Sequence, residues 1–376
     1  MYLVVGCGLS GVTIAERIAN VMGKEVLIIE QRDHIAGNCY DYIDPETQIL
    51  VCKYGAHIYR SNKKDVWDYI NHFSEWERWE HKVLSKVDNR FVSVPVNITT
   101  INELCGENIQ TPEEMDRWLS INQVKYDTIE NSEQVCKSRV GEVLYEKMFR
   151  NYTIKQWDKE PRELDASVLA NIPLRRSFDT RYFDHKYQAL PKHGYTEFVQ
   201  KMLSHDNISV RLNTSYDDFR RSNDLKKYEG VIFTGPIDEY FKDHGLPRLE
   251  YRSLDFKIER FCNMNYFQPN SVVNYPQLDV SFTRIVEYKH FLNQDASGTI
   301  IVTETSKAHG DPYYPVPNKE NTELYEKYRT KAKNEESNNV YFVGRLANYK
   351  YFNMDQTIEN ALVFFDSLKK ERMLVT

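Results

Sequence analysis

Three glycines near the start of the chain have a spacing that brings a phosphate close to the backbone. Gly6, Gly8 and Gly11 form a G-x-G-x-x-G pattern directly after a short apolar run. Such glycines allow a tight turn, the approach of a pyrophosphate and close packing of the next helix on the first strand. A helix that begins near Ser10 adds free N–H groups and a partial positive charge at its N-terminus. Glu30 ends the next strand, where a carboxylate accepts hydrogen bonds from ribose hydroxyls, so these residues predict a dinucleotide site.

The segment after Glu30 bears on which dinucleotide binds. Arg32 lies two residues after Glu30, and the small pair Ala36-Gly37 precedes Asn38. In FAD-binding relatives of the Rossmann fold, this region makes the next contacts with the cofactor. An acidic residue after a glycine turn is also compatible with NAD, so NAD stays open, and the extension favours FAD.

The elements that hold this turn alternate between strand and helix. Residues 2–5, 10–22 and 25–30 read as strand, helix and strand. The pattern returns with a helix at 195–204, strands at 208–212, 230–233 and 339–344, and a last helix at 354–368. That helix begins near Asp355, and its N-terminal dipole would favour an anionic reduced flavin. Alternating elements of this kind predict a parallel sheet.

Other segments interrupt this alternation. Residues 62–81 read as an amphipathic helix, and residues 83–97 as a hairpin turned at Asp88-Asn89. Residues 102–157 read as helical, with Thr111 as an N-cap before Pro112 and with an apolar stripe over 140–149. Antiparallel strands are expected at 251–257, 271–274, 282–287 and 298–304.

The predicted fold is therefore α/β, with a discontinuous Rossmann-like FAD-binding domain, an inserted helical domain and an antiparallel β-sheet domain. The FAD-binding domain is expected to take residues 1–82, 191–248 and 335–376. The helical insertion takes residues 98–160, and the sheet domain, which carries the substrate, takes residues 83–97, 161–190 and 249–334.

Length and composition bear on the class of protein. A chain of 376 residues can form more than one core. Its 49 basic and 55 acidic residues give a net charge of −6 without a long basic run, which argues against a nucleic-acid partner. No apolar run approaches the roughly 20 residues of a membrane span. Because a strand at Tyr2 leaves no room for a signal peptide, we expect a soluble, cytoplasmic protein with no membrane partner. The six cysteines show no C-x-x-C spacing.

Longer motifs along the chain indicate one family. They lie at residues 53–60, 93–97, 151–157, 171–175, 182–183, 190–195, 284–285, 313–315 and 344–351. In these motifs and their order, the chain resembles the UDP-galactopyranose mutases over nearly its whole length. The resemblance implies interconversion of the pyranose and furanose forms of a nucleotide-activated galactose, with FAD that must be reduced but is not consumed. It also implies a role in surface polysaccharide synthesis, and members of the family are often homodimers.

In the mechanism that the resemblance implies, N5 of the reduced flavin attacks C1 of the sugar and expels UDP. The covalent flavin–sugar intermediate opens, and O4 rather than O5 closes the new ring. The protein then has to keep the flavin reduced, hold the departing diphosphate and stack the base. This chemistry requires no metal ion, and none is expected.

Positions that match the family's motifs supply the expected site residues. His57, Arg60 and Arg284 are expected to be catalytic. Cofactor contacts are expected from Gly6, Gly8, Ser10, Gly11, Glu30, Gln31, Asn38, Tyr54, His57, Gly344, Arg345, Met354 and Asp355. Substrate contacts are expected from Tyr152, Trp157, Asn171, Arg175, Tyr182, Arg284, Tyr314 and Tyr351. The resemblance implies that Arg284 binds the diphosphate, that Tyr152 stacks on uracil and that Trp157 lines the sugar.

Several positions depart from the family's pattern around the substrate. Ala56 and Arg60 replace proline and histidine, and Asn171 replaces a loop arginine that closes over the diphosphate. Asn353 replaces an aspartate, and Met148 replaces an aromatic residue beside the base. Losing the charge-assisted bond at position 171 weakens diphosphate binding by about 1.5–3 kcal/mol unless another cation replaces it.

These departures leave alternatives open. Arg176 could supply the missing cation. Because relatives that act on UDP-N-acetylgalactosamine carry arginine at the position of Arg60, that sugar or dTDP-fucopyranose could replace UDP-galactopyranose as the substrate. An FAD-dependent oxidoreductase of the amine-oxidase type would share the glycine turn and Glu30. The change at Asn171 also allows an inactive binding protein.

Overall fold

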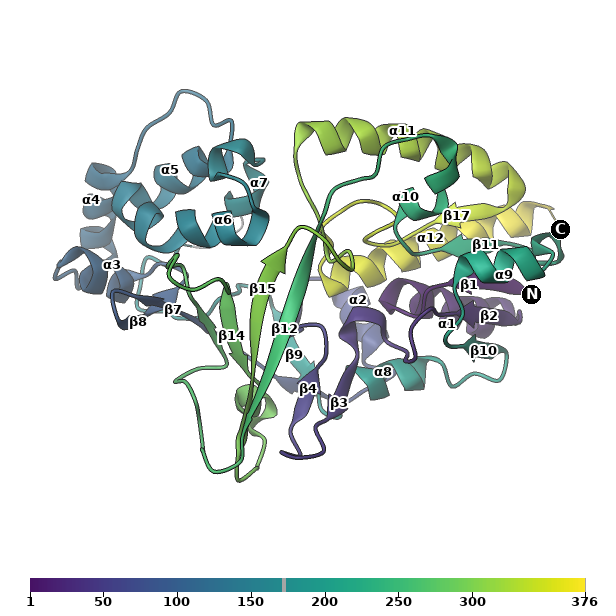
Figure 1. Cartoon of the computed structure of the whole chain (residues 1–376), viewed down its shortest axis with the longest axis horizontal. Helices are drawn as coiled ribbons and strands as arrows, with labels where there is room; N and C mark the ends of the chain where they lie inside the picture. The colour runs from purple at the N-terminus through teal and green to yellow at the C-terminus, as the bar shows by residue number, and fades with distance from the viewer. Residues whose placement is uncertain (171–173, 376) are drawn as a thin grey trace.

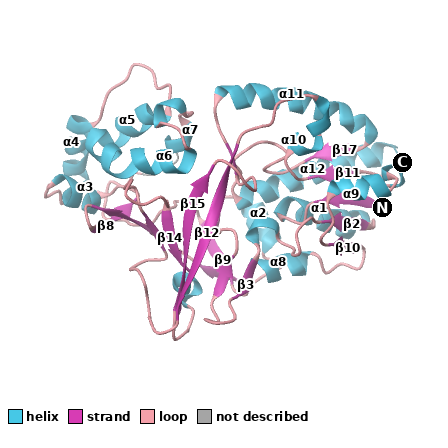
Figure 2. Cartoon of the chain, in the orientation of Figure 1, coloured by secondary structure: helices cyan, strands magenta, loops and turns pink. Residues whose placement is uncertain are grey.

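The chain forms a parallel sheet, an antiparallel sheet and a cap of helices. A computed structural model of the chain describes residues 1–170 and 174–375. The parallel sheet with its helices lies at one side of the molecule, the helical cap at the other, and the antiparallel sheet between and below them (Figure 1). The part that holds the parallel sheet contains both strands and helices, whereas the cap contains helices and loops (Figure 2).

Five parallel strands form the sheet that carries the glycine turn. In spatial order they are β10 (Ile208–Arg211), β2 (Val26–Ile29), β1 (Tyr2–Val5), β11 (Val231–Phe233) and β17 (Val340–Phe342). Both faces are buried, because alternate residues of β1 and β2 enter two different hydrophobic cores. The predicted Rossmann-like unit is confirmed, and its strands come from distant parts of the chain.

Helices cover both faces of this sheet. The helices α1 (Leu9–Met22), α8 (Tyr195–Met202) and α12 (Met354–Val375) pack on one face, and α9 (Tyr216–Ser222) packs on the other. Helix α1 starts directly after β1, at the carboxyl edge of the sheet. Ligands of open α/β sheets bind at that edge.

Seven strands form the second sheet. In spatial order they are β16 (Tyr314–Pro315), β12 (Tyr251–Phe261), β15 (Thr299–Lys307), β14 (Arg284–Glu287), β13 (Val272–Asn274), β7 (Val83–Val87) and β8 (Arg90–Val94). As predicted, the hairpin of β7 and β8 turns at Asp88 and Asn89. Both residues have positive φ. The hairpin joins the sheet through a parallel pairing of β7 with β13, so the sheet is antiparallel except at this junction.

The helical cap consists of α3 (Ile98–Cys105), α4 (Pro112–Asn122), α5 (Ser132–Leu144), α6 (Asn151–Trp157) and α7 (Ser167–Ala170). The Thr111 side chain accepts from the Glu114 N–H, which confirms the predicted cap. The prediction of one regular helix over 140–149 is wrong. Gly141 has a φ of 82°, which kinks α5. A side chain at this position would clash with the Asn122 carbonyl. A π-helical turn at 145–150 then leads into α6.

The prediction of a helix over 62–81 is also wrong in its second half. Only α2 (Lys64–Ile70) is helical there, and β6 (Trp76–Arg78) follows. The strand β9 (Tyr187–Pro191) pairs with both β6 and β5 (Tyr59–Ser61) in a small third sheet. Because Trp76 packs its ring on other aromatic side chains, tertiary contacts override the helical periodicity of this segment.

The remaining elements are β3 (Asp41–Ile43) and β4 (Leu50–Cys52), which pair with each other, and the helices α10 (Ile237–Tyr240) and α11 (Lys319–Glu335). All six cysteines are free. Among the described residues, no helix combines the length and apolar content that crossing a membrane requires.

Candidate active site

A cavity of about 800 Å³ joins the carboxyl edge of the parallel sheet to the second sheet and the helical cap. This volume is typical of cofactor and small-molecule sites. Most of the predicted site residues line the cavity, namely Gly6, Gly8, Ser10, Glu30, Gln31, Asn38, His57, Arg60, Tyr152, Trp157, Tyr182, Arg284, Tyr314, Arg345, Tyr351 and Met354. The fold thus brings motifs from both ends of the chain to one site.

The glycine turn forms one wall of the cavity. Gly8 is the N-cap of α1 and gives its first turn no side-chain hydrogen bond, so that turn can bind an anion. Gly37 has a φ of 55°, and a Cβ there would lie 2.8 Å from the Gly8 Cα. Two backbones therefore meet beside the cavity because neither residue carries a side chain.

Glu30 is buried beside this turn. Its Oε2 accepts from the Cys7 N–H at 2.8 Å, and its Oε1 accepts from the Arg32 N–H at 2.9 Å. A carboxylate has lone pairs for further donors. Arg32 also donates to Asn38 Oδ1 at 2.9 Å, which positions Asn38 at the cavity wall.

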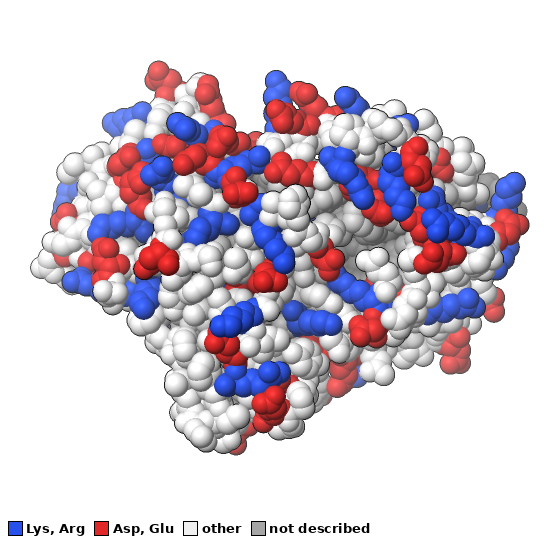
Figure 3. Space-filling view, viewed as in Figure 1, with Lys and Arg blue, Asp and Glu red and all other residues white. Residues whose placement is uncertain are grey.

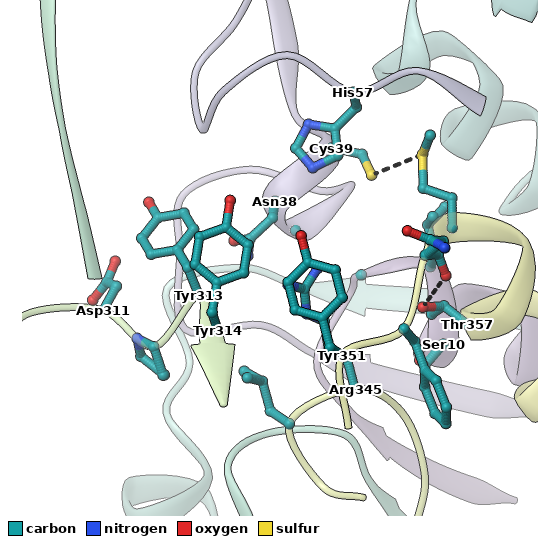
Figure 4. A pocket seen from close by; sticks show the side chains of 18 of the residues that line it. Ser10, Asn38, Cys39, His57, Asp311, Tyr313, Tyr314, Arg345, Tyr351 and Thr357 are labelled. Carbon is teal, nitrogen blue, oxygen red and sulfur yellow. Dashed lines mark hydrogen bonds between the residues drawn. The ribbon is translucent and has the colours of Figure 1, made fainter. Parts of the chain in front are cut away.

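Arg345 lies against two tyrosine rings of the cavity wall. Its guanidinium carbon is 5.0 Å from the ring centre of Tyr314 and 4.5 Å from that of Tyr351. The two rings are stacked with their centres 5.4 Å apart (Figure 4). Nε and Nη2 of Arg345 are buried and have no hydrogen-bond partner among the described residues. Buried guanidinium nitrogens without partners are costly, so this part of the cavity suits an oxygen-rich or anionic ligand group.

Arg284 is the cation that the second sheet contributes. It faces Glu304 across β14 and β15, and its Nε donates to Glu304 Oε2 at 2.6 Å. Burial opposes the charge of Arg284, but the Glu304 carboxylate outweighs it and raises the pKa of Arg284. Glu304 is 1% exposed. Glu304 was not predicted from the sequence, because an isolated acid in a strand carries no local signal.

Helix α6 contributes an aromatic wall. Tyr152, Gln156 and Trp157 line the cavity from this helix, and Met148 lines it from the preceding π-helical turn. The ring of Trp157 lies 6.5 Å from that of Tyr314, centre to centre. Burial raises the pKa of Tyr152 to about 12, so its hydroxyl stays protonated. Aromatic faces of this kind can stack a base or a sugar.

Two of the departures from the family's pattern contact each other. Arg60 Nη2 donates to Asn353 Oδ1 at 2.8 Å, and its guanidinium carbon lies 3.8 Å from the ring centre of Phe183. Burial lowers the pKa of Arg60, and its Nε has no partner among residues 1–170 and 174–375. The hydrogen-bond partner of this cation is thus a neutral amide. Phe183 lies in a matched motif but was given no role in the site, because its contact with Arg60 is not local in sequence.

Two histidines in the cavity wall are neutral near pH 7. Burial lowers the pKa of His57 to about 4, with Arg345 and Arg284 adding to the effect. Burial, with Arg284 and Arg60, lowers the pKa of His81 to about 3. His57 Nδ1 donates to the Gly55 carbonyl at 2.8 Å, which leaves Nε2 as an acceptor. His81 Nδ1 accepts from the Trp79 indole at 3.4 Å, so its Nε2 carries the proton.

Some predicted residues do not line the cavity, namely Gly11, Tyr54, Gly344, Asp355 and Arg175. Arg175 binds Asp184 and the Arg181 carbonyl instead. Arg176 pairs with Asp116 at 2.8 Å, and its side chain is 63% exposed. Asn171 lies outside the described residues.

The surface and the acidic groups add two observations. On the face in Figure 3, basic and acidic side chains are interspersed, in line with their near balance in the sequence. Within the described part of the chain, no three or more His, Cys, Asp or Glu side chains gather where they could hold a metal ion.

Comparisons with known proteins agree on one family. The family model of UDP-galactopyranose mutase matches residues 147–351, and that of an NAD(P)-binding Rossmann-like domain matches residues 4–73. A probable UDP-galactopyranose mutase of Klebsiella pneumoniae is 39% identical over 368 residues, which cover 96% of this chain and 92% of that protein. A dTDP-fucopyranose mutase of Escherichia coli is 35% identical over 366 residues, which cover 96% of each chain.

Solved structures show the same architecture. A crystal structure of reduced UDP-galactopyranose mutase aligns with a TM-score of 0.76 at 14% identity, covering 98% of this chain and 93% of that one. A putative protoporphyrinogen oxidase from Exiguobacterium aligns with a TM-score of 0.68 at 12% identity, covering 98% of both. At such identities the likeness concerns the fold alone. The sequence matches extend over nearly the whole chain, and they show that it belongs to the UDP-galactopyranose mutase family and is an enzyme of the mutase class.

Proposed function

We propose that the chain binds FAD and interconverts the pyranose and furanose forms of a nucleotide-activated galactose-type sugar, with UDP-galactopyranose as the default substrate. The observation that carries this proposal is one continuous cavity with two different ends. The glycine turn and Glu30 line one end, and Arg284, Tyr152 and Trp157 line the other. A nucleotide sugar and a flavin can therefore bind side by side.

The residues present are suited to FAD. The first turn of α1 and the side-chain-free contact between Gly8 and Gly37 leave room and N–H donors for a pyrophosphate. Glu30 keeps lone pairs for ribose hydroxyls. The partnerless nitrogens of Arg345 suit the oxygen atoms of the isoalloxazine ring. When reduced and bound, FAD supplies a nucleophilic nitrogen to the anomeric carbon of the sugar.

The protein's own groups hold the nucleotide sugar and its leaving group. Arg284, kept charged by Glu304, binds the diphosphate, and the hydroxyls of Tyr314 and Tyr351 add donors. As the anomeric C–O bond breaks, negative charge grows on the diphosphate, so these contacts strengthen in the transition state. The ring of Tyr152 stacks on the base.

The departures around the sugar and base support two alternative substrates. Arg60 presents a partly buried cation whose hydrogen-bond partner is an amide, so it can donate to an acceptor on a modified sugar such as UDP-N-acetylgalactosamine. Met148 lies in the cavity wall near Tyr152 and can accommodate a thymine methyl group. The 35% identity to a dTDP-fucopyranose mutase supports dTDP-fucopyranose as a second alternative. The furanose product would serve polysaccharide synthesis.

The test uses the purified full-length protein. We expect a yellow protein with an absorbance maximum at about 450 nm. After reduction with dithionite, it should convert at least one of UDP-galactose, UDP-N-acetylgalactosamine and dTDP-fucose into a furanose that chromatography resolves. A lack of product from all three sugars would contradict the proposed function, and net oxidation of a substrate would indicate an oxidoreductase instead.

A further inference from the structure

Lys155 is a residue of the 151–157 motif to which the proposed function gives no task. Its ammonium donates to four backbone carbonyls, those of Tyr275 at 2.5 Å, Gln277 at 2.7 Å, Phe282 at 2.7 Å and Val280 at 3.2 Å. An ammonium has three N–H donors, so four acceptors at these distances use all of them. This lysine is thus held in one place and binds nothing else through its head group.

All four carbonyls belong to the loop that connects β13 to β14. The residues at the two ends of this loop, Asn274 and Arg284, face each other across the two strands, and both line the cavity. Between them, the backbone makes one cross-strand hydrogen bond, from the Tyr275 N–H to the Thr283 carbonyl at 2.8 Å. The Gln277 side chain donates to the Lys86 carbonyl, and the four carbonyls named above turn inward to Lys155. The ammonium therefore supplies the centre around which this loop is folded.

Helix α6 also lines the cavity. Tyr152, Gln156 and Trp157 of this helix are part of the cavity wall, whereas Lys155 reaches the loop of the second sheet. Figure 1 shows α6 beside the end of that sheet. Lys155 therefore connects the helix that carries the aromatic wall to the loop that leads into Arg284. Removing an ammonium from water is costly unless hydrogen bonds replace the lost water. The loop must therefore keep the arrangement that brings its carbonyls to Lys155.

We propose that Lys155 is a positioning residue: it folds the loop between β13 and β14 and so fixes Arg284 and Asn274 opposite Tyr152 and Trp157. This inference rests on the proposed function, since that function assigns Arg284, Tyr152 and Trp157 to the nucleotide sugar. Lys155 itself touches neither substrate nor cofactor. Its loss should weaken binding of the nucleotide part and leave the flavin end of the cavity unchanged.

The test compares Lys155→Met, which keeps the stem but removes every donor, with Lys155→Gln, which keeps two N–H donors. Lys86→Met is the matched control, because the Lys86 ammonium lies 5.8 Å from the ring centre of Tyr275 in the same loop but has no carbonyl cage. For each protein, flavin content, the dissociation constant of UDP, and KM and kcat are measured. For Lys155→Met we expect the UDP dissociation constant and KM to rise by roughly tenfold or more. We expect kcat to fall as well, because the contacts of Arg284 strengthen in the transition state, and flavin content to stay close to that of the unmodified protein.

Lys155→Gln should fall between Lys155→Met and the unmodified protein, and Lys86→Met should match the unmodified protein. Unchanged UDP affinity in Lys155→Met would overturn the inference, and so would a fall in kcat at constant KM. If Lys155→Met does not fold, Lys155→Gln decides, and unchanged UDP affinity in that variant would overturn the inference. The unmodified protein in the same series distinguishes failure of this inference from failure of the proposed function. If the unmodified protein neither binds UDP nor converts a nucleotide sugar, the proposed function itself fails.

Discussion

Gly37→Ala tests whether the glycine-lined wall holds a flavin. Gly37 and Gly8 both line the cavity, and a Cβ at position 37 would lie 2.8 Å from the Gly8 Cα. Ordinary contacts of a Cβ begin at 3.4 Å. The two backbones would therefore have to separate by about 0.6 Å, at the place where we propose that the pyrophosphate binds.

The backbone strain of the substitution can be separated from this displacement. Gly37 has a φ of 55°, so alanine there also costs about 1–2 kcal/mol for a left-handed conformation. Gly23→Ala is the matched control: Gly23 ends α1 with a φ of 64°, and a Cβ there meets no atom within 4 Å. Both variants should lose similar stability from strain, but only Gly37→Ala moves the wall of the cavity.

The assay is the flavin content of the purified variants, followed by titration of each apoprotein with FAD. Because losing one hydrogen bond to a charged pyrophosphate costs about 1.5–3 kcal/mol, we expect FAD affinity to fall by roughly tenfold or more in Gly37→Ala. Gly23→Ala should bind FAD as the unmodified protein does. Equal FAD affinity in all three proteins would refute the assignment of this wall to the cofactor.

Two further predictions concern the substrate and the stability of the fold. Arg60→His combined with Asn353→Asp removes the hydrogen bond of 2.8 Å between these residues and the contact of the Arg60 guanidinium with Phe183. Because a hydrogen bond to a charged group is worth about 1.5–3 kcal/mol, the ratio of kcat/KM between UDP-galactose and the modified sugars should change by about tenfold or more. An unchanged ratio would show that Arg60 takes no part in substrate selection. The pKa of His81 is lowered to about 3 by burial, so the unfolded chain binds one more proton than the folded one between that pH and the ordinary histidine pKa of about 6.5. The free energy of unfolding should therefore fall as the pH falls through this window, and in His81→Gln its slope in denaturant titrations should be shallower by about 1.4 kcal/mol per pH unit; equal slopes would show that His81 is not buried as a neutral ring.

The features that the sequence predicts well are determined by neighbouring residues. The glycine turn needs three glycines within six residues, the cap at Thr111 needs Glu114, and the hairpin needs Asp88 and Asn89 at positive φ. In each case the physical cause lies within one turn of the backbone. Such features can be read from a single sequence.

The features that could not be predicted from the sequence depend on contacts between distant segments. Glu304 pairs with Arg284 only because β14 and β15 are in one particular register, and Phe183 meets Arg60 from a segment more than 100 residues away. The Asn122 carbonyl occupies the space that a side chain at Gly141 would need, and the strand pairing of β6 depends on β9. Periodicity cannot specify a register or a packing partner. Most of the site residues predicted from the sequence nevertheless line the cavity.

The central claim is that one cavity holds a nucleotide sugar against a reduced flavin that is not consumed. The most direct test divides one preparation of the purified protein into an oxidised and a dithionite-reduced half and follows furanose formation from UDP-galactose, UDP-N-acetylgalactosamine and dTDP-fucose in both. We expect many turnovers per flavin in the reduced half with at least one sugar, and almost none in the oxidised half. Equal conversion in the two halves, or product that never exceeds the amount of flavin, would contradict the account.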